Sequence, residues 1–104
     1  MKSYAYVLNI KPGYEDEYKR RHDEMGEEMR SFLTEAGFQN YHIYRFGLVL
    51  FAYFECEDFD RVRQVSAESD VNRRWAEYMG PIMDIDIDSA TGFPFLLTEM
   101  FCHS

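Results

Sequence analysis

His22 is the side chain in this sequence that is best suited to proton-transfer chemistry. It follows Tyr18 by four residues, a spacing that places the two side chains next to each other on one face of a helix. The rest of that face is apolar, so we expect the imidazole to point toward a sheet rather than toward water. Imidazole titrates near neutral pH and can give and take protons. Two interpretations follow: an acid–base residue, or a core histidine hydrogen-bonded to the backbone.

Aromatic side chains elsewhere could form the walls of a small-molecule pocket. Tyr41, His42 and Tyr44 fall on one expected strand, with Tyr41 on the face opposite to the other two. Trp75 is the only tryptophan, and its indole offers a flat apolar surface with one hydrogen-bond donor. Tyrosine and tryptophan also pack well in ordinary cores, so each of these residues fits a structural role as well as a binding role.

Metal and cofactor motifs are missing from the chain. Asp84, Asp86 and Asp88 alternate and could share one face of an extended segment, but no histidine or glycine-turn pattern accompanies them, which favours an acidic surface loop. Cys56 and Cys102 do not form a CxxC pair. The chain also lacks a glycine-rich phosphate loop, an HExxH motif and a Gly-x-Ser-x-Gly motif. We therefore predict no metal and no cofactor.

Strands are predicted where aromatic and branched residues cluster between turn signals. Residues 4–10 are the first such run, and residues 41–46 and 48–56 follow as a hairpin. The run at 48–56 is almost continuously apolar, which is typical of a central strand. Residues 83–92 are expected to be a loop, and residues 93–101 a last strand.

Helices are predicted between these strands. The strongest helical pattern begins after Pro12-Gly13 and runs as one helix to a left-handed cap at Gly37. Asp58 begins a helix that reaches about residue 67. Ser69 caps a further helix, which carries Trp75 on its apolar stripe and continues to residue 82.

The element order β-α-β-β-α-β predicts an α+β protein with a ferredoxin-like subunit. At 104 residues the chain has room for one domain, residues 1–104. Helices on one face of a four-stranded sheet leave the other face bare. Aromatic residues make up 17% of the chain, more than a minimal core needs. We therefore expect a homodimer, with aromatic side chains at the subunit contact and in a binding cleft.

The charge of the chain narrows the range of partners. Asp and Glu number 19 against 11 Lys and Arg, for a formal charge of −8. Such a charge disfavours nucleic acid, whose phosphates need basic side chains, and it disfavours anionic membranes, but it permits a neutral small molecule. The first ten residues turn polar too soon for a signal peptide, and no apolar run reaches the ~20 residues of a membrane span. The sequence therefore predicts a cytoplasmic protein.

Four short segments make the functional prediction specific. They are Tyr18-Lys-Arg-Arg-His22, Asn40-Tyr41-His-Ile-Tyr44, Leu50-Phe-Ala52 and Arg74-Trp75-Ala-Glu-Tyr78-Met79. In this order, and at nearly these separations, they resemble the L-rhamnose mutarotase family over roughly residues 4 to 83. The resemblance implies a single mutarotase-like domain and a dimeric α+β barrel. It also implies a cofactor-independent isomerase of carbohydrate metabolism that interconverts the α and β anomers of L-rhamnose.

The resemblance also assigns roles by position. It makes His22 the proton donor and Tyr18, Tyr41 and Trp75 sugar contacts, together with the residue at position 76. Family members carry two successive tryptophans here, whereas this chain has Trp75 followed by Ala76. The departure implies a wider pocket or a different pyranose, such as the 6-deoxy sugar L-fucose. The sequence does not decide which group is the conjugate base: a tyrosine, a carboxylate, a backbone carbonyl or water.

Other functions fit the same pattern of elements. A small dimeric-barrel monooxygenase acting on an aromatic substrate or on haem would share the barrel and its aromatic lining. A non-catalytic module that binds a sugar or another metabolite would leave His22 as a core residue. A purely structural dimerisation domain would bind no small molecule.

Overall fold

The sheet in the computed structural model, which describes residues 1–104, has the strand order of a ferredoxin-like domain. Its four strands are arranged β2-β3-β1-β4, and all neighbouring pairs are antiparallel. The strands are β1 (Lys2–Ile10), β2 (Gln39–Phe46), β3 (Val49–Cys56) and β4 (Met83–Asp84). The strands predicted at 4–10, 41–46 and 48–56, and the α+β fold class, are therefore confirmed.

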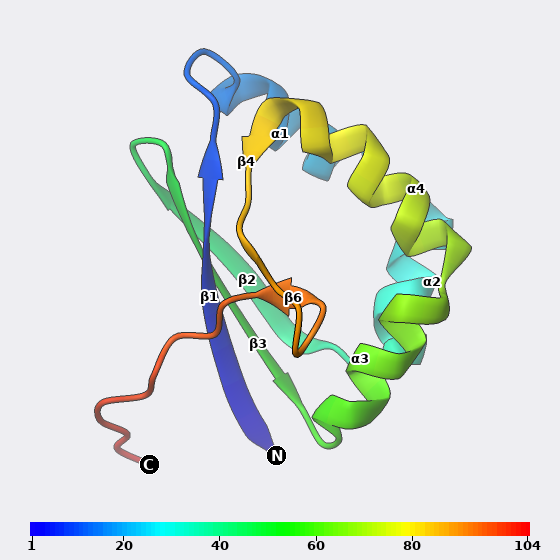
Figure 1. Cartoon of the computed structure of the whole chain (residues 1–104), viewed down its shortest axis with the longest axis vertical. Coiled ribbons are helices and arrows are strands. Elements are labelled where there is room, and N and C mark those ends of the chain that lie inside the picture. The colour runs from blue at the N-terminus through cyan, green and yellow to red at the C-terminus, as the bar shows by residue number, and fades with distance from the viewer.

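Four α-helices cover one side of this sheet (Figure 1). They are α1 (Glu15–Asp23), α2 (Glu27–Ala36), α3 (Phe59–Glu68) and α4 (Asp70–Met79), and α4 is followed by the 3-10 turn η1 (Gly80–Ile82). The caps predicted for the last two α-helices are confirmed. The Asp58 side chain accepts a hydrogen bond from the Arg61 amide, and the Ser69 hydroxyl accepts one from the Asn72 amide.

The prediction of one long helix from Pro12-Gly13 to Gly37 was wrong. The backbone leaves the helix after Asp23, and Gly26 is extended at φ −78° and ψ 170° before α2 begins. Glycine costs up to about 1 kcal/mol in a helix interior because it loses more backbone freedom than other residues. A break at Gly26 therefore costs little. The cap at Gly37 is confirmed, with a φ of 105°.

The prediction for the C-terminal part was also wrong. Residues 83–92 contain two short strands, β4 and β5 (Ile87–Asp88), and β5 pairs with β6 (Phe93–Pro94). The expected strand at 93–101 is reduced to β6, an isolated bridge between Leu96 and Tyr6, and a hydrogen bond from the Leu97 amide to the Ala5 carbonyl. One reason is Pro94, which has no N–H to donate. The other is that β4 already occupies one end of the free edge of β1.

The core lies between the sheet and the helices. Alternate residues of β1 and β3 face the helices and are buried. The largest fully buried side chains are Phe54, Ile10, Leu50, Val62 and Cys56. The β5–β6 hairpin packs at one end of this layer, where the rings of Phe59 and Phe93 lie 5.7 Å apart, and Figure 1 shows β6 between the sheet and α3.

The opposite face of the sheet is bare and aromatic. Tyr44 and Phe46 on β2 are 65% and 80% exposed, and Phe51 and Tyr53 on β3 are 44% and 36% exposed. We call this surface the outer face. The expectation that one sheet face is left uncovered is therefore confirmed.

Candidate functional site

His22 lies in the last turn of α1, half-buried, beside the buried Tyr18. The imidazole stacks on the Tyr18 ring at 4.3 Å between centroids and meets the Trp75 indole edge-to-face at 5.2 Å and 88°. Acidic residues in the first turn of α1 and basic residues in its last turn suit the helix dipole. The helix thus holds the imidazole between a phenol and an indole.

The hydrogen bond made by His22 determines which ring nitrogen is free. Nδ1 lies 3.1 Å from the Tyr18 carbonyl oxygen. A carbonyl oxygen only accepts, so Nδ1 carries a proton and donates it. In the neutral imidazole, Nε2 therefore has a free lone pair. Burial lowers the pKa of His22 below its usual range, against a smaller opposing effect of the backbone hydrogen bond. The neutral form with a basic Nε2 is thus favoured at pH 7.

A hollow of about 200 Å³ between the sheet and the helices brings the predicted site residues together. His22, Tyr18, Tyr41, Trp75 and Ala76 all line it. The side chains that line it are mostly apolar, as in most small-molecule sites. Of the two interpretations of His22, the structure supports parts of both, since the imidazole bonds to the backbone and also faces a cavity.

Two further hollows adjoin His22. One of about 290 Å³ is also lined by Tyr41 and Trp75 and extends to Met25 and Arg30. The other, of about 270 Å³, lies on the side of charged residues and is lined by Glu15, Lys19, Asp23 and Arg45 besides His22, Tyr18, Ile43 and Leu50. His22 therefore lies where an apolar interior meets a charged rim.

Tyr6 is a site residue that the sequence analysis missed. It lines the 200 Å³ hollow, and its hydroxyl is hydrogen-bonded to the Tyr41 hydroxyl. Burial raises the pKa of Tyr6 to about 12, and it raises the pKa values of Tyr18 and Tyr41 as well. The three phenols are therefore neutral at pH 7. Tyr6 alternates with Leu8 and Ile10 along β1, and this spacing could have predicted that Tyr6 faces the interior.

Other candidate residues lie away from this hollow. His42 and Tyr44 stack on each other at 6.1 Å on the exposed outer face. The Asp88 carboxylate accepts a hydrogen bond from the Ala90 amide in the β5–β6 turn. Nowhere in residues 1–104 are three His, Cys, Asp or Glu side chains grouped closely enough to hold a metal ion, so Asp84, Asp86 and Asp88 do not converge.

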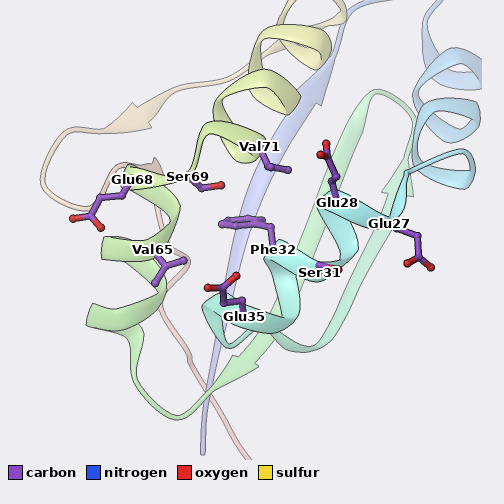
Figure 2. A pocket seen from close by; sticks show the side chains of 9 residues that line it. All are labelled: Glu27, Glu28, Ser31, Phe32, Glu35, Val65, Glu68, Ser69 and Val71. Carbon is purple, nitrogen blue, oxygen red and sulfur yellow. The ribbon is translucent and has the colours of Figure 1, made fainter.

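A surface hollow of about 610 Å³ lies among α2, α3 and the start of α4. Its apolar floor includes Phe32, and its rim is acidic. Figure 2 shows Glu27 and Glu68 directed away from Phe32, so the carboxylates do not meet at a common point. No histidine or cysteine lines it. The hollow beside His22 is therefore the better candidate for a site.

Fold and site together define a small ferredoxin-like α+β protein whose helix-covered layer holds a neutral histidine in an aromatic hollow. Comparison with known proteins identifies the family to which this fold and site belong. Residues 3–102 match the family model described as L-rhamnose mutarotase. The chain belongs to the L-rhamnose mutarotase family, whose members are isomerases.

Individual relatives agree with this assignment. The L-rhamnose mutarotase of Ligilactobacillus salivarius is 39% identical over 101 residues, covering 91% of each chain. That of Oceanobacillus iheyensis is 33% identical over 103 residues, covering 97% of each. The crystal structure of an L-rhamnose mutarotase from Formosa agariphila superimposes with a TM-score of 0.78 at 23% identity, with full coverage of both chains.

A second solved structure shares the fold alone. Tetracenomycin F2 cyclase of Streptomyces glaucescens, a type-II polyketide cyclase, superimposes with a TM-score of 0.72 at 14% identity, covering 100% of this chain and 98% of the cyclase. Proteins with different activities therefore share this framework, and the activity has to be argued from the side chains in the hollow.

Proposed function

We propose that the protein interconverts the α and β anomers of L-rhamnose, or of a related 6-deoxy sugar such as L-fucose, as a single domain over residues 1–104 and without a cofactor. The observation that carries the proposal is the position of His22, with a free Nε2, in a hollow that Tyr18, Tyr41, Trp75 and Ala76 also line. Family membership supports the sugar substrate. We assign catalysis to His22 and sugar contacts to the other four residues.

In the proposed reaction, His22 carries a proton between two oxygens of the sugar. The neutral imidazole accepts the proton of the anomeric hydroxyl at Nε2. The resulting oxyanion re-forms the carbonyl as the bond from the anomeric carbon to the ring oxygen breaks, and Nε2 returns the proton to that oxygen. The open aldehyde turns, and the same steps in reverse close the ring on its other face. Both oxygens are bonded to the anomeric carbon, so one nitrogen can serve both.

The surroundings of His22 suit this proton transfer. A group that must work in both directions performs best with a pKa near the working pH. Burial lowers the pKa of His22, which keeps the resting imidazole neutral and ready to accept the first proton. The phenols of Tyr18 and Tyr41 stay protonated and can donate hydrogen bonds to oxygens that gain negative charge.

Aromatic and apolar side chains would hold the sugar beside Nε2. The Trp75 indole, edge-on to the imidazole, offers a flat surface to the C–H groups of a pyranose. Met29 and Leu33 from α2 line the same hollow and would cover the 6-methyl group. Ala76 is exposed and has only a methyl side chain, so the rim is open next to Trp75.

We also propose that two copies associate through the outer face as a homodimer. Exposed aromatic side chains gather on this face of β2 and β3, where Tyr44 and Phe51 are cross-strand partners, and such a cluster marks an interaction surface. Pairing two such faces would bury these rings and complete a barrel of two sheets. The negative charge of the chain and the apolar lining of the hollow support neither nucleic acid nor a membrane surface as partner, and no helix is long and apolar enough to span a bilayer.

The proposal is tested by measuring anomer exchange with saturation-transfer NMR on L-rhamnose, L-fucose and unmodified hexoses. Exchange is expected to accelerate for at least one 6-deoxy sugar. Ala76→Trp is expected to lower the KM of the preferred pyranose about two- to tenfold, by adding a ring against the sugar. Glu77→Trp is the control, because Glu77 is exposed on the same helix and does not line the hollow. The absence of exchange with every sugar would contradict the proposal.

A further inference from the structure

Tyr6 and Tyr41 meet although their strands are not neighbours. β3 lies between β1 and β2 in the sheet, and Ala52 of β3 is the cross-strand partner of both Tyr6 and Ile43. The alanine methyl group is short, so it leaves room above β3 for phenols from both flanking strands. The two hydroxyls are hydrogen-bonded to each other there. The pair is therefore a product of the sheet order and of one small residue.

The two tyrosines differ in the hollows that they line. Tyr6 is 5% exposed, and its ring packs against the edge of Phe54 at 6.3 Å between centroids. Tyr41 is more exposed as a whole residue, although its hydroxyl is also buried, and it lines the second hollow, which Tyr6 does not. A ligand that enters from that side reaches Tyr41 before Tyr6. The Tyr6 hydroxyl has the Tyr41 hydroxyl as its only hydrogen-bond partner.

The number of protons in the pair leaves two possible directions for the bond. Each neutral phenol has one proton, so one of the two lies in the mutual hydrogen bond and the other is free. If Tyr41 donated to Tyr6, the Tyr6 proton would be left without an acceptor in a buried position, which is unfavourable. If Tyr6 donates to Tyr41, the free proton belongs to the phenol that lines both hollows, where an oxygen of a ligand can accept it.

We propose that Tyr6 is a positioning residue that donates to the Tyr41 oxygen and so turns the Tyr41 O–H toward the sugar. This inference rests on the proposed function. Because a hydroxyl that accepts a hydrogen bond becomes a stronger donor, Tyr41 then stabilises the negative charge that develops on the sugar oxygens during ring opening. Tyr6 acts through Tyr41, because its hydroxyl is bonded to the Tyr41 hydroxyl and to no other group. Its effect therefore falls on kcat more than on KM.

The kinetic test is a double-mutant cycle of Tyr6→Phe, Tyr41→Phe and the double variant. Tyr6→Phe is expected to lower kcat about two- to tenfold, the range of one net hydrogen bond, with KM nearly unchanged. In the Tyr41→Phe background, the Tyr6 substitution is expected to have no further effect. Tyr4→Phe is the matched control, since Tyr4 is on the same strand, packs toward Phe54 and does not line the hollow. An unchanged kcat in Tyr6→Phe, or equal losses in both backgrounds, overturns the proposal.

A measurement on the unmodified protein tests the direction of the bond without a variant. The bridging hydroxyl proton is sheltered from exchange by burial, and proton NMR can assign it to the ring that carries it through its contacts with that ring's protons. Assignment to Tyr6 is expected, and assignment to Tyr41 overturns the proposal. This result does not depend on sugar turnover. It therefore separates a failure of the Tyr6 inference from a failure of the mutarotase proposal, which anomer exchange reports.

Discussion

The helix-covered layer and the outer face of the sheet each hold a histidine stacked on a tyrosine. His22 stacks on Tyr18 at 4.3 Å and bonds through Nδ1 to a backbone carbonyl at 3.1 Å. His42 stacks on Tyr44 at 6.1 Å and bonds through Nδ1 to the Asn40 carbonyl at 2.9 Å. The two local arrangements are alike in residue type, in stacking and in the nitrogen that is engaged.

Their surroundings are different. His22 is half-buried and adjoins three hollows, and the indole of Trp75 closes one side. In a single subunit His42 is exposed, on a surface that has no helix above it, and it lines none of these three hollows. A low-dielectric enclosure strengthens interactions with charge that develops on a bound ligand, and it holds the ligand in place. The comparison indicates that enclosure, rather than the histidine–tyrosine pair itself, makes one arrangement suited to catalysis.

The largest effect expected from this comparison is on turnover. His22→Gln keeps a donor for the Tyr18 carbonyl but has no group that can cycle a proton. It is expected to lower the rate of anomer exchange by about 10²–10⁴-fold, the usual contribution of acid–base catalysis. His42→Gln, on the outer face, is expected to leave the rate within about twofold, because His42 does not line the hollow. Saturation-transfer NMR on the preferred sugar measures both.

Two results would break the comparison. Equal losses in His22→Gln and His42→Gln would mean that the outer histidine also serves the reaction, for example through a second subunit. Retained exchange in His22→Gln would remove His22 from the mechanism. Circular dichroism and thermal unfolding of each variant separate a lost fold from a lost proton carrier.

The second prediction concerns the outer face alone. Phe51 is 44% exposed in one subunit, and the proposed homodimer would bury it. Phe51→Lys is expected to convert the dimer to a monomer at micromolar concentration, because burying an unpaired ammonium group is strongly unfavourable. Sedimentation velocity or light scattering measures the change. Glu77→Lys, which alters charge on the helix side, is expected to stay dimeric. A monomeric wild type, or a dimeric Phe51→Lys, would contradict the proposed interface.

Local chemistry is what made much of the fold predictable from the sequence. The end of α2 at Gly37 and the caps at Asp58 and Ser69 depend on one residue and its near neighbours. The C-terminal strand does not depend on its local sequence alone. Residues 83–84 pair with the C-terminal end of the free edge of β1, and residues 96–97 pair with the middle of the same edge, at Ala5 and Tyr6. Tertiary packing decides which segment pairs with which part of that edge. The local sequence pattern therefore does not predict this pairing.

The candidate site divides in the same way. The spacing between Tyr18 and His22 predicted their contact, since side chains four residues apart on a helix are neighbours. The resemblance of short segments added Tyr41, Trp75 and Ala76. Tyr6 required knowledge of the strand order, because its partner lies two strands away across β3. Residues that act through contacts across a sheet are therefore the part of the site that sequence reasoning misses.

The smallest expected effect is on stability, and it follows from the burial of His22. Burial holds the pKa of His22 in the folded protein below its ordinary value of 6.5, to which it returns on unfolding. Between these two values the unfolded chain binds a proton that the folded chain does not. The free energy of unfolding therefore falls as the pH drops through this window, and this group has no effect above it. Asp23 acts in the opposite direction, but desolvation is the larger cause.

Urea unfolding of the wild type and of His22→Gln at a series of pH values isolates this contribution. All other titrating groups are shared by the two proteins, so they cancel in the difference. The wild type is expected to lose stability relative to His22→Gln as the pH falls below about 6.5, with a constant difference at higher pH. A wild type that gained relative stability on acidification would mean that the folded protein favours the charged imidazole. In that case His22 would begin the reaction as an acid, and the enclosure would not distinguish it from His42 in the way argued above.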